Sequence, residues 1–262
     1  MSELQNTRAP AASMAMLPHE YRVMFELEQE YWWYRGLRVL IDELLTRYAA
    51  RDGSTKILDA GCGTGKNLEL LLARGNAWGV DIVEEAIRFC QLRGLPHERA
   101  LVASLLDLPF PDHFFELAFS FDVICNITDD VAAFAEIRRT LKPNGVVIAQ
   151  LPAYQWLWSA HDVAVGHKYR YTASDLREKI SRAGLRVERV TYLNTALFPF
   201  IALMRFARRS EARNGHAYSD LVPLPHAMNE SLTRVFSAEM RRTATRNMPF
   251  GISLLAIARR VD

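Results

Sequence analysis

Residues 57–65 read Ile-Leu-Asp-Ala-Gly-Cys-Gly-Thr-Gly, and a run with helical spacing, Asn-Leu-Glu-Leu-Leu-Leu, follows at residues 67–72. The short apolar run predicts a buried strand, and the three glycines at alternate positions let the chain turn sharply into the helix. Without side chains, Gly61, Gly63 and Gly65 also let the backbone come close to a ligand. Turns of this kind, at the carboxyl end of a first parallel strand, bind nucleotide-like ligands in doubly wound α/β sheets.

The spacing of the glycines limits the class of ligand that this loop can bind. Dinucleotide-binding loops read G-x-G-x-x-G, and phosphate-binding loops place Lys and Ser or Thr after their second glycine. Here the pattern is G-x-G-x-G, with Asp59 two residues before the first glycine. This stretch resembles the first motif of the class I S-adenosylmethionine (SAM)-dependent methyltransferases. Taken by itself, the loop could also be an ordinary strand–helix turn.

The resemblance implies roles for the residues of this loop. In the family, the acid at the position of Asp59 lies near the sulfonium and amino end of the cofactor. The backbone from Gly61 to Gly65, which includes Cys62 and Gly63, wraps the methionine moiety and the ribose.

A second acid occupies the position expected for ribose recognition. Residues 77–81 read as a strand that ends at Asp81, 20 residues beyond Gly61. At this distance a carboxylate meets ribose hydroxyls in nucleotide-binding sheets, so we expect Asp81, with Ile82 beside it, to bind the cofactor. The alternative is that Asp81 only caps the helix predicted from Val83 to Arg93.

Two later segments also resemble the family. Its members often read acid-x-x-x-Leu-Pro-Phe after the third strand, which places the adenine-contacting acid at Ser104 and the neighbouring backbone amide at Leu105. Serine departs from this pattern, so we expect a weaker adenine contact, or one shared with Asp107. Phe121 and Asp122, at the end of the fourth strand, correspond to residues near the methyl-transfer site. A Leu-Lys-Pro-x-Gly turn at residues 141–145 then precedes the fifth strand, predicted at residues 145–151.

The predicted fold is therefore a doubly wound, Rossmann-like seven-stranded methyltransferase sheet. Strand 6 is expected at residues 185–192 and strand 7 at residues 251–259, paired as an antiparallel hairpin at the sheet edge as in the family. The predicted parts are a disordered tail (residues 1–16), an N-terminal helical cap (17–52) and a methyltransferase domain (53–262) with a helical insertion at about 194–248.

The helical cap contains four consecutive aromatic residues, Tyr31-Trp32-Trp33-Tyr34, followed by Arg35. Apolar residues recur at three- and four-residue steps from Pro18 to Tyr48, which predicts a helix that this cluster interrupts. Four successive aromatic residues cannot all face one core. We expect Tyr31, Trp32 and Trp33 to cover the cofactor and acceptor, with Arg35 reaching a carboxylate. The alternative is a helix that only packs on the sheet edge.

Residues 152–172 leave strand 5 at the ligand-binding edge of the sheet and supply candidate acceptor-site residues. His161, Asp162, His167 and Tyr169 are the acid–base candidates, and Tyr154 and Trp158 are candidates for acceptor binding. The alternative is a surface loop with packed aromatic residues. No cysteine is near, and the histidine spacing matches no common zinc pattern, so no metal is expected.

The insertion combines an apolar run at residues 197–204 with arginines at positions 205, 208, 209 and 213, and a helix is predicted at residues 230–240. Three interpretations remain open. The insertion could be a lid with a solvated basic face, a homodimer surface, or the wall of a pocket for a greasy or membrane-resident acceptor.

The composition of the chain limits its expected partners and cellular location. A net charge of +2, with 24% charged residues, argues against a dedicated nucleic-acid binder. Three cysteines fit reduced thiols in the cytoplasm better than a disulfide framework. Residues 1–18 lack a signal-peptide pattern, and the longest apolar run is about half of a membrane span. We therefore expect a soluble, cytoplasmic protein.

The functional prediction is a methyltransferase that uses SAM, releases S-adenosylhomocysteine and modifies O, N or C of a small hydrophobic or aromatic acceptor, such as an indole or phenolic natural product. The alternatives are an isoprenoid or lipid acceptor at a membrane surface, and a SAM-binding scaffold without activity. A nicotinamide oxidoreductase is disfavoured by the glycine spacing.

Overall fold

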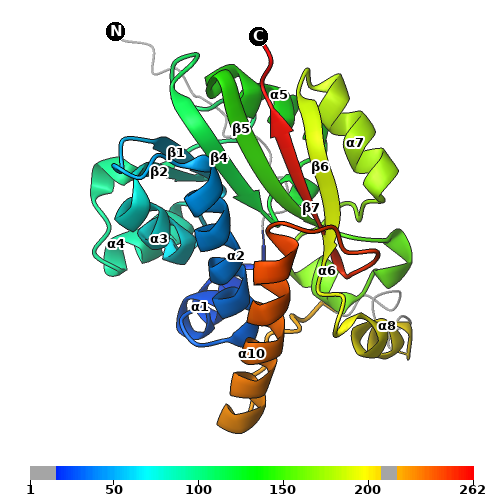
Figure 1. The fold of residues 1–262 in the computed structure, drawn as a ribbon. Coiled ribbons are helices and arrows are strands. Elements are labelled where there is room, and N and C mark those ends of the chain that lie inside the picture. The colour runs from blue at the N-terminus through cyan, green and yellow to red at the C-terminus, as the bar shows by residue number, and fades with distance from the viewer. Residues whose placement is uncertain (1–15, 208–216) are drawn as a thin grey trace, which may run out of the picture.

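A seven-stranded sheet with helices on both faces forms the body of the protein (Figure 1). This computed structural model describes residues 16–207 and 217–262, so most of the predicted tail and Arg208, Arg209 and Arg213 lie outside the described residues. The strands are β1 (Lys56–Ala60), β2 (Asn76–Asp81), β3 (Ala100–Val102), β4 (Phe115–Phe121), β5 (Leu141–Pro152), β6 (Arg186–Leu193) and β7 (Ser253–Arg259). The α-helices are α1 (Pro18–Leu27), α2 (Trp32–Tyr48), α3 (Lys66–Arg74), α4 (Glu84–Leu92), α5 (Asp130–Thr140), α6 (Ala160–Ala164), α7 (Ala173–Arg182), α8 (Phe198–Ala207) and α10 (His226–Thr243). Short 3₁₀ turns are η1 (His97–Arg99), η2 (Ile124–Asn126) and η3 (Gln155–Leu157).

The strand order is β3-β2-β1-β4-β5-β7-β6. Strands β1 to β5 are parallel, and β7 lies antiparallel between β5 and β6. The long insertion separates β6 from β7 in sequence, yet the two strands pair from Arg186↔Arg259 to Leu193↔Ser253. The predicted fold class is confirmed.

Alternate residues of the central strands supply two separate cores. Ile57 and Ile148 belong to the core shared with α2, α3 and α10, whereas their neighbours Leu58 and Val147 belong to the core shared with α5 and α7. A sheet that is covered on both faces needs apolar residues at every position. This explains why the strands read as continuous apolar runs instead of alternating with polar residues.

Two boundaries differ from the sequence prediction. The predicted interruption of the helix lies earlier in the chain: α1 ends at Leu27, and the aromatic cluster, which was expected to form the break, opens α2 instead. The guanidinium of Arg38 donates to the carbonyl oxygens of Glu28 at 2.6 Å and Gln29 at 2.7 Å, which satisfies backbone groups freed at the break. The predicted turn at residues 141–145 lies within β5, because Leu141 already pairs with Phe115 and a register shift accommodates the turn.

The cap and the insertion pack against each other, with α10 running alongside α2 (Figure 1). The ring of Trp33 stacks on Phe236 with centroids 4.9 Å apart. Gly36 lies under the same phenyl ring, where a Cβ atom would come within 2.1 Å of Cδ1. The guanidinium of Arg35 forms an ion pair with Glu230. Elements far apart in sequence thus form one helical layer on one face of the sheet.

We expect Gly36→Ala to lower the thermal denaturation midpoint. Displacing the Phe236 ring should cost about 1–3 kcal/mol, which more than offsets the roughly 1 kcal/mol that alanine gains in helix propensity. The control is a double-mutant cycle with Phe236→Leu, which makes room for the methyl group. The same Gly36→Ala penalty in both backgrounds would contradict the steric explanation.

Candidate active site

A cavity of about 890 Å³ lies at the carboxyl ends of the strands. Gly61, after β1, Asp81 at the end of β2 and Phe121 at the end of β4 form its floor. Tyr31, Trp32, Trp33 and Tyr34 of the cap and Leu197, Phe200, Ile201 and Met204 in and beside α8 form its walls. The cavity therefore extends from the glycine loop to the insertion.

The glycine loop needs its glycines for conformation and for space. The φ angles of Gly61, Gly63 and Gly65 are +93°, +52° and +88°, a region that other residues rarely adopt. A Cβ at Gly61 would lie 2.2 Å from the Val123 side chain. Gly61 and Gly63, with Cys62 between them, line the cavity. Gly65 instead packs against Cys90 of α4.

Asp81 has the capping role that the sequence left open, and its position leaves ribose recognition as a prediction. Its carboxylate accepts the backbone N–H groups of Gly63 and Val83, both at 3.0 Å. It thereby fixes the glycine loop and the start of α4, as a capping acid would. The same carboxylate lines the cavity and retains free lone pairs, so ribose recognition remains a prediction compatible with the geometry.

Asp59 is buried behind the loop, and among the described residues its Oδ2 has no hydrogen-bond partner. Burial, followed by the negative charges of Asp81 and Glu28, raises the pKa of Asp59 to about 7. A positively charged group would stabilise this carboxylate, because one of its oxygens has no partner and other acids lie near it. The residues present therefore fit SAM, whose ammonium and sulfonium are both positive.

Asp59 itself does not line the cavity, whereas five further predicted cofactor residues do. Ile82, Ser104, Leu105, Phe121 and Asp122 all line it. The hydroxyl of Ser104 accepts the backbone N–H of Leu106 at 3.1 Å and holds the turn after β3.

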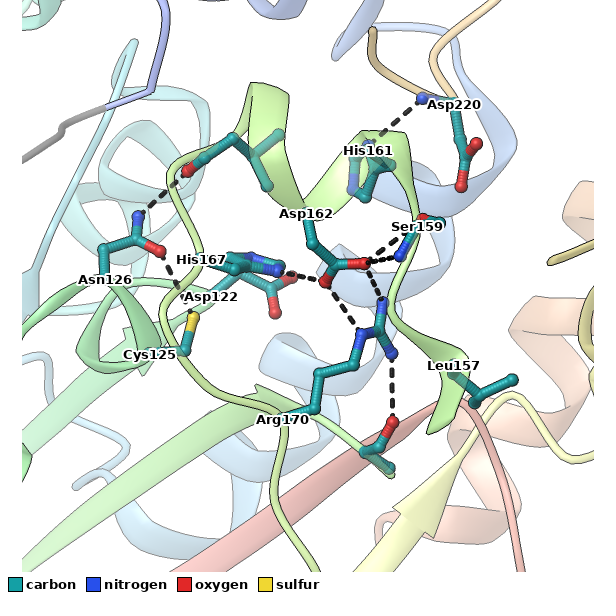
Figure 2. Close-up of polar contacts among 12 residues, drawn as sticks. Asp122, Cys125, Asn126, Leu157, Ser159, His161, Asp162, His167, Arg170 and Asp220 are labelled. Atoms are coloured by element: carbon teal, nitrogen blue, oxygen red, sulfur yellow. Dashed lines mark hydrogen bonds and ion pairs between the residues drawn. The ribbon is translucent and has the colours of Figure 1, made fainter. Parts of the chain in front are cut away.

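A buried charge cluster closes the other side of the cavity, with Asp162 at its centre (Figure 2). Its Oδ1 binds Nδ1 of His167 and accepts from Nε of Arg170, both at 2.8 Å. Its Oδ2 accepts the backbone N–H of Ser159 at 2.8 Å, and Arg205 of α8 lies 3.6 Å from it. Burial alone would raise the pKa of Asp162, but the Arg170 charge and the His167 hydrogen bond hold it well below its usual range. Asp162 is thus a permanent anion that anchors its neighbours.

The two histidines of the cluster have opposite hydrogen-bonding roles. Because Nδ1 of His167 donates to Asp162, its Nε2 carries a lone pair and can accept a proton. Nδ1 of His161 accepts the backbone N–H of Asp220 at 3.1 Å, so the His161 proton lies on Nε2. Burial lowers the pKa of His161 to about 4, which keeps the ring neutral. Both rings line the cavity, with centroids 6.1 Å apart.

Asp122 connects the charge cluster to the cofactor end of the cavity. It follows β4 with a φ angle of +56° and accepts from Nε2 of Gln150 at 3.0 Å. Burial raises its pKa, while His167 and the Gln150 hydrogen bond oppose the shift. The phenol of Tyr34 also lines the cavity; burial, with the charges of Glu28 and Asp122 adding to it, raises its pKa well above the usual range. Tyr34 therefore offers a neutral hydroxyl.

Asp122, Cys125 and His167 each place one ligand atom within 4.8 Å of the others, an arrangement that the sequence did not predict. Zinc accepts these ligand types. The Arg170 guanidinium is close enough to lower the pKa of Asp122 and would repel a metal cation.

Asp162, like Asp59 and Gly65, is not among the residues that line the cavity, and neither are four further predicted site residues. The hydroxyl of Tyr169 donates to the carbonyl of Thr128 at 3.1 Å, and Arg35 pairs with Glu230. Tyr154 stacks on Tyr192 with centroids 5.4 Å apart, and Trp158 ends the η3 turn.

The sequence analysis missed Tyr34, Glu28, Arg170, Arg205 and Asp220, all of which the structure brings to the cavity or the charge cluster. The sequence does contain a sign that Arg205 is buried and paired, because it is the one charged residue of the apolar helix α8. Its Nη2 donates to Asp220 at 2.7 Å. No sequence pattern identifies Asp220, because its role depends on the path of the insertion.

Comparison with known proteins agrees with this geometry. A family model for methyltransferase domains matches residues 58–149. A Mycolicibacterium smegmatis protein described as a probable S-adenosylmethionine-dependent methyltransferase is 30% identical over 166 residues, a match that spans only 62% of this chain and 62% of the relative. A Mycobacterium tuberculosis protein of the same description is 26% identical over 252 residues, which cover 90% of this chain and 87% of the relative.

A solved structure supports the fold. The methyltransferase in complex with the Haloferax volcanii Trm112 methyltransferase activator is similar to this chain with a TM-score of 0.59 and 19% identity. The similarity covers 94% of this chain and 95% of the other. At this level of identity the likeness concerns the fold alone.

The Asp59 environment predicts pH-dependent cofactor binding. An ammonium partner requires the ionised carboxylate, and the pKa of Asp59 is raised to about 7. Affinity for S-adenosylhomocysteine should therefore be constant above pH 7 and fall by up to about tenfold per pH unit below it. Calorimetric titration between pH 5.5 and 8 measures this. Asp59→Asn should bind more weakly and remove most of the pH dependence, whereas a flat profile for the unmodified protein would contradict the assignment.

Proposed function

We propose that this chain, which belongs to the class I SAM-dependent methyltransferase family, transfers a methyl group to a small hydrophobic acceptor held beside His167. One observation carries the proposal: an apolar cavity joins the glycine loop to a buried cluster that offers one proton acceptor and one hydrogen-bond donor.

The walls of the cavity support an acceptor that is mostly hydrocarbon. Leu197, Ile201, Met204, Leu224 and Leu232 surround the part that lies away from the glycine loop. The charge cluster adds His161, His167 and Arg170 to the polar lining. Such a site suits a molecule with an apolar body and one polar end, which the cluster would orient.

The aromatic, indole-like acceptor has weaker support. That expectation used the aromatic residues of both the cap and the segment after β5. Tyr154 and Trp158 do not line the cavity, and Trp33 already stacks on Phe236. The lining instead favours an aliphatic or prenyl-like body, with an aromatic head group compatible but not required.

The cofactor, when bound, supplies an electrophilic methyl group on its sulfonium. The chain has to hold the acceptor in line with that methyl group, which provides much of the rate acceleration in such a substitution. Nε2–H of His161 can donate to the acceptor's polar end, and Nε2 of His167 can take the proton that a hydroxyl or acidic carbon must lose. Asp162 keeps His167 in the required tautomer and stabilises the imidazolium that forms. We therefore favour O- or C-methylation of an acidic group.

The cofactor and the acceptor class can be tested separately. Calorimetry with SAM, S-adenosylhomocysteine and NAD should show micromolar binding of the first two only. Transfer of labelled methyl should then be measured to prenylated phenols, free indoles and aliphatic carboxylic acids. Cofactor binding without transfer to any acceptor with an apolar body would favour the scaffold alternative.

His167→Ala should lower kcat by about 10²–10⁴-fold while changing cofactor affinity little, because the lost group acts on the acceptor proton. The fall in kcat at low pH, which is caused by protonation of the base, should disappear from the pH–rate profile. His97→Ala, at an exposed position on η1, is the matched control and should leave kcat unchanged. Normal turnover in His167→Ala would rule out the proposed base.

A further inference from the structure

Helix α8 exposes large apolar side chains to solvent. Phe200 is 70% exposed and Leu203 is 69% exposed, in a helix whose one charged residue, Arg205, is buried. Trp156, 55% exposed, packs beside the helix with its ring centroid 6.2 Å from that of Phe198. Phe198 in turn contacts the exposed Phe250 at 5.3 Å. Exposed apolar residues that gather in this way mark an interaction surface.

This surface is continuous with the mouth of the cavity. Phe200, Val222 and Met228 are exposed to solvent and also line the cavity. An apolar path therefore leads from the outside of the molecule to the charge cluster. In Figure 1, α8 lies at the side of the molecule, away from the C-terminus and separate from α10.

The arginines of the insertion favour a partner with negative charge. Residues 194–248 contain eight arginines and four acidic residues; Arg205 is buried and paired with Asp220, and Arg208 and Arg209 follow α8 directly in the sequence. On α10, Arg234, Arg241 and Arg242 are exposed. Apolar helices accompanied by arginine lie in the interface of anionic membranes. A second copy of the chain would bring the same positive charge against itself and cover the mouth of the cavity.

We propose that α8 and the apolar rim formed by Trp156, Phe200, Leu203 and Val222 dock on the surface of an anionic phospholipid bilayer. Among the described residues no helix is long and apolar enough to cross a membrane, and the ten residues of α8 lie in the interface plane. The mouth of the cavity then faces the acyl region, and the acceptor enters from the lipid phase. This entry route rests on the proposed function, whereas the docking itself does not.

Vesicle flotation of the full chain tests the docking. The protein should float with phosphatidylcholine vesicles that contain phosphatidylglycerol, and less with phosphatidylcholine alone. Leu203→Asp places a charge on the exposed face and should weaken vesicle partitioning about tenfold or more. The matched control is Leu92→Asp on α4, where the leucine is 73% exposed and far from the rim; its partitioning should be unchanged. If circular dichroism shows that Leu203→Asp is misfolded, the same experiment is done with Leu203→Ser.

Depth of insertion gives a second readout. Vesicles with brominated acyl chains should quench tryptophan fluorescence, and Trp156→Phe should remove a large part of that quenching while the protein still floats. S-adenosylhomocysteine affinity, measured on the same variants without vesicles, should be unchanged, which separates failure of docking from failure of the proposed function. Absence of flotation with anionic vesicles would overturn the proposal. So would a dimer in solution that Leu203→Asp dissociates.

Discussion

The arrangement of the candidate active site depends on one buried carboxylate. Asp162 is fully buried and binds Arg170, His167 and the Ser159 backbone, with Arg205 close by. Removing an ion from water costs several kcal/mol, and only a complete set of charged and hydrogen-bonded partners offsets that cost. The segment after β5, helix α6 and helix α8 are therefore held in the one arrangement that satisfies this carboxylate. Losing a single partner would leave an uncompensated charge beside the cavity.

The same constraint explains how two neighbouring histidines acquire different chemistry. His167 donates to Asp162 and keeps a free lone pair, whereas His161 accepts from a backbone amide of the insertion and keeps its proton on Nε2. The insertion thus does more than cover the cavity, because it selects the tautomer of one histidine and supplies Arg205 to the cluster. The outer face of α8 is apolar, so the insertion that completes the polar end of the site also forms the apolar rim at the mouth of the cavity.

Sequence reasoning identified the cofactor side of the site better than the acceptor side. Ile82, Ser104 and Phe121 line the cavity as expected because each follows a strand, and the carboxyl ends of parallel strands share one edge. Tyr154 and Trp158 were predicted from residue type and from their place after strand 5, but neither lines the cavity, and Tyr154 stacks on Tyr192 instead. Tyr34 was passed over although it belongs to the predicted aromatic cluster, because the helical phase of that cluster depends on a break at residue 28 that Arg38 stabilises.

The sequence alone determined the sheet, the glycine loop, the acid at the end of β2 and the presence of a cap and an insertion. These features depend on local patterns: short continuous apolar runs for strands, three- and four-residue steps for helices, and positive φ angles for glycines. Only the tertiary structure decided which histidine can accept a proton, that Asp162 is an anchor, and that Arg205 joins it from a helix more than 40 residues away. Protonation and ion pairing depend on burial and on partners distant in the chain, and no local pattern encodes either.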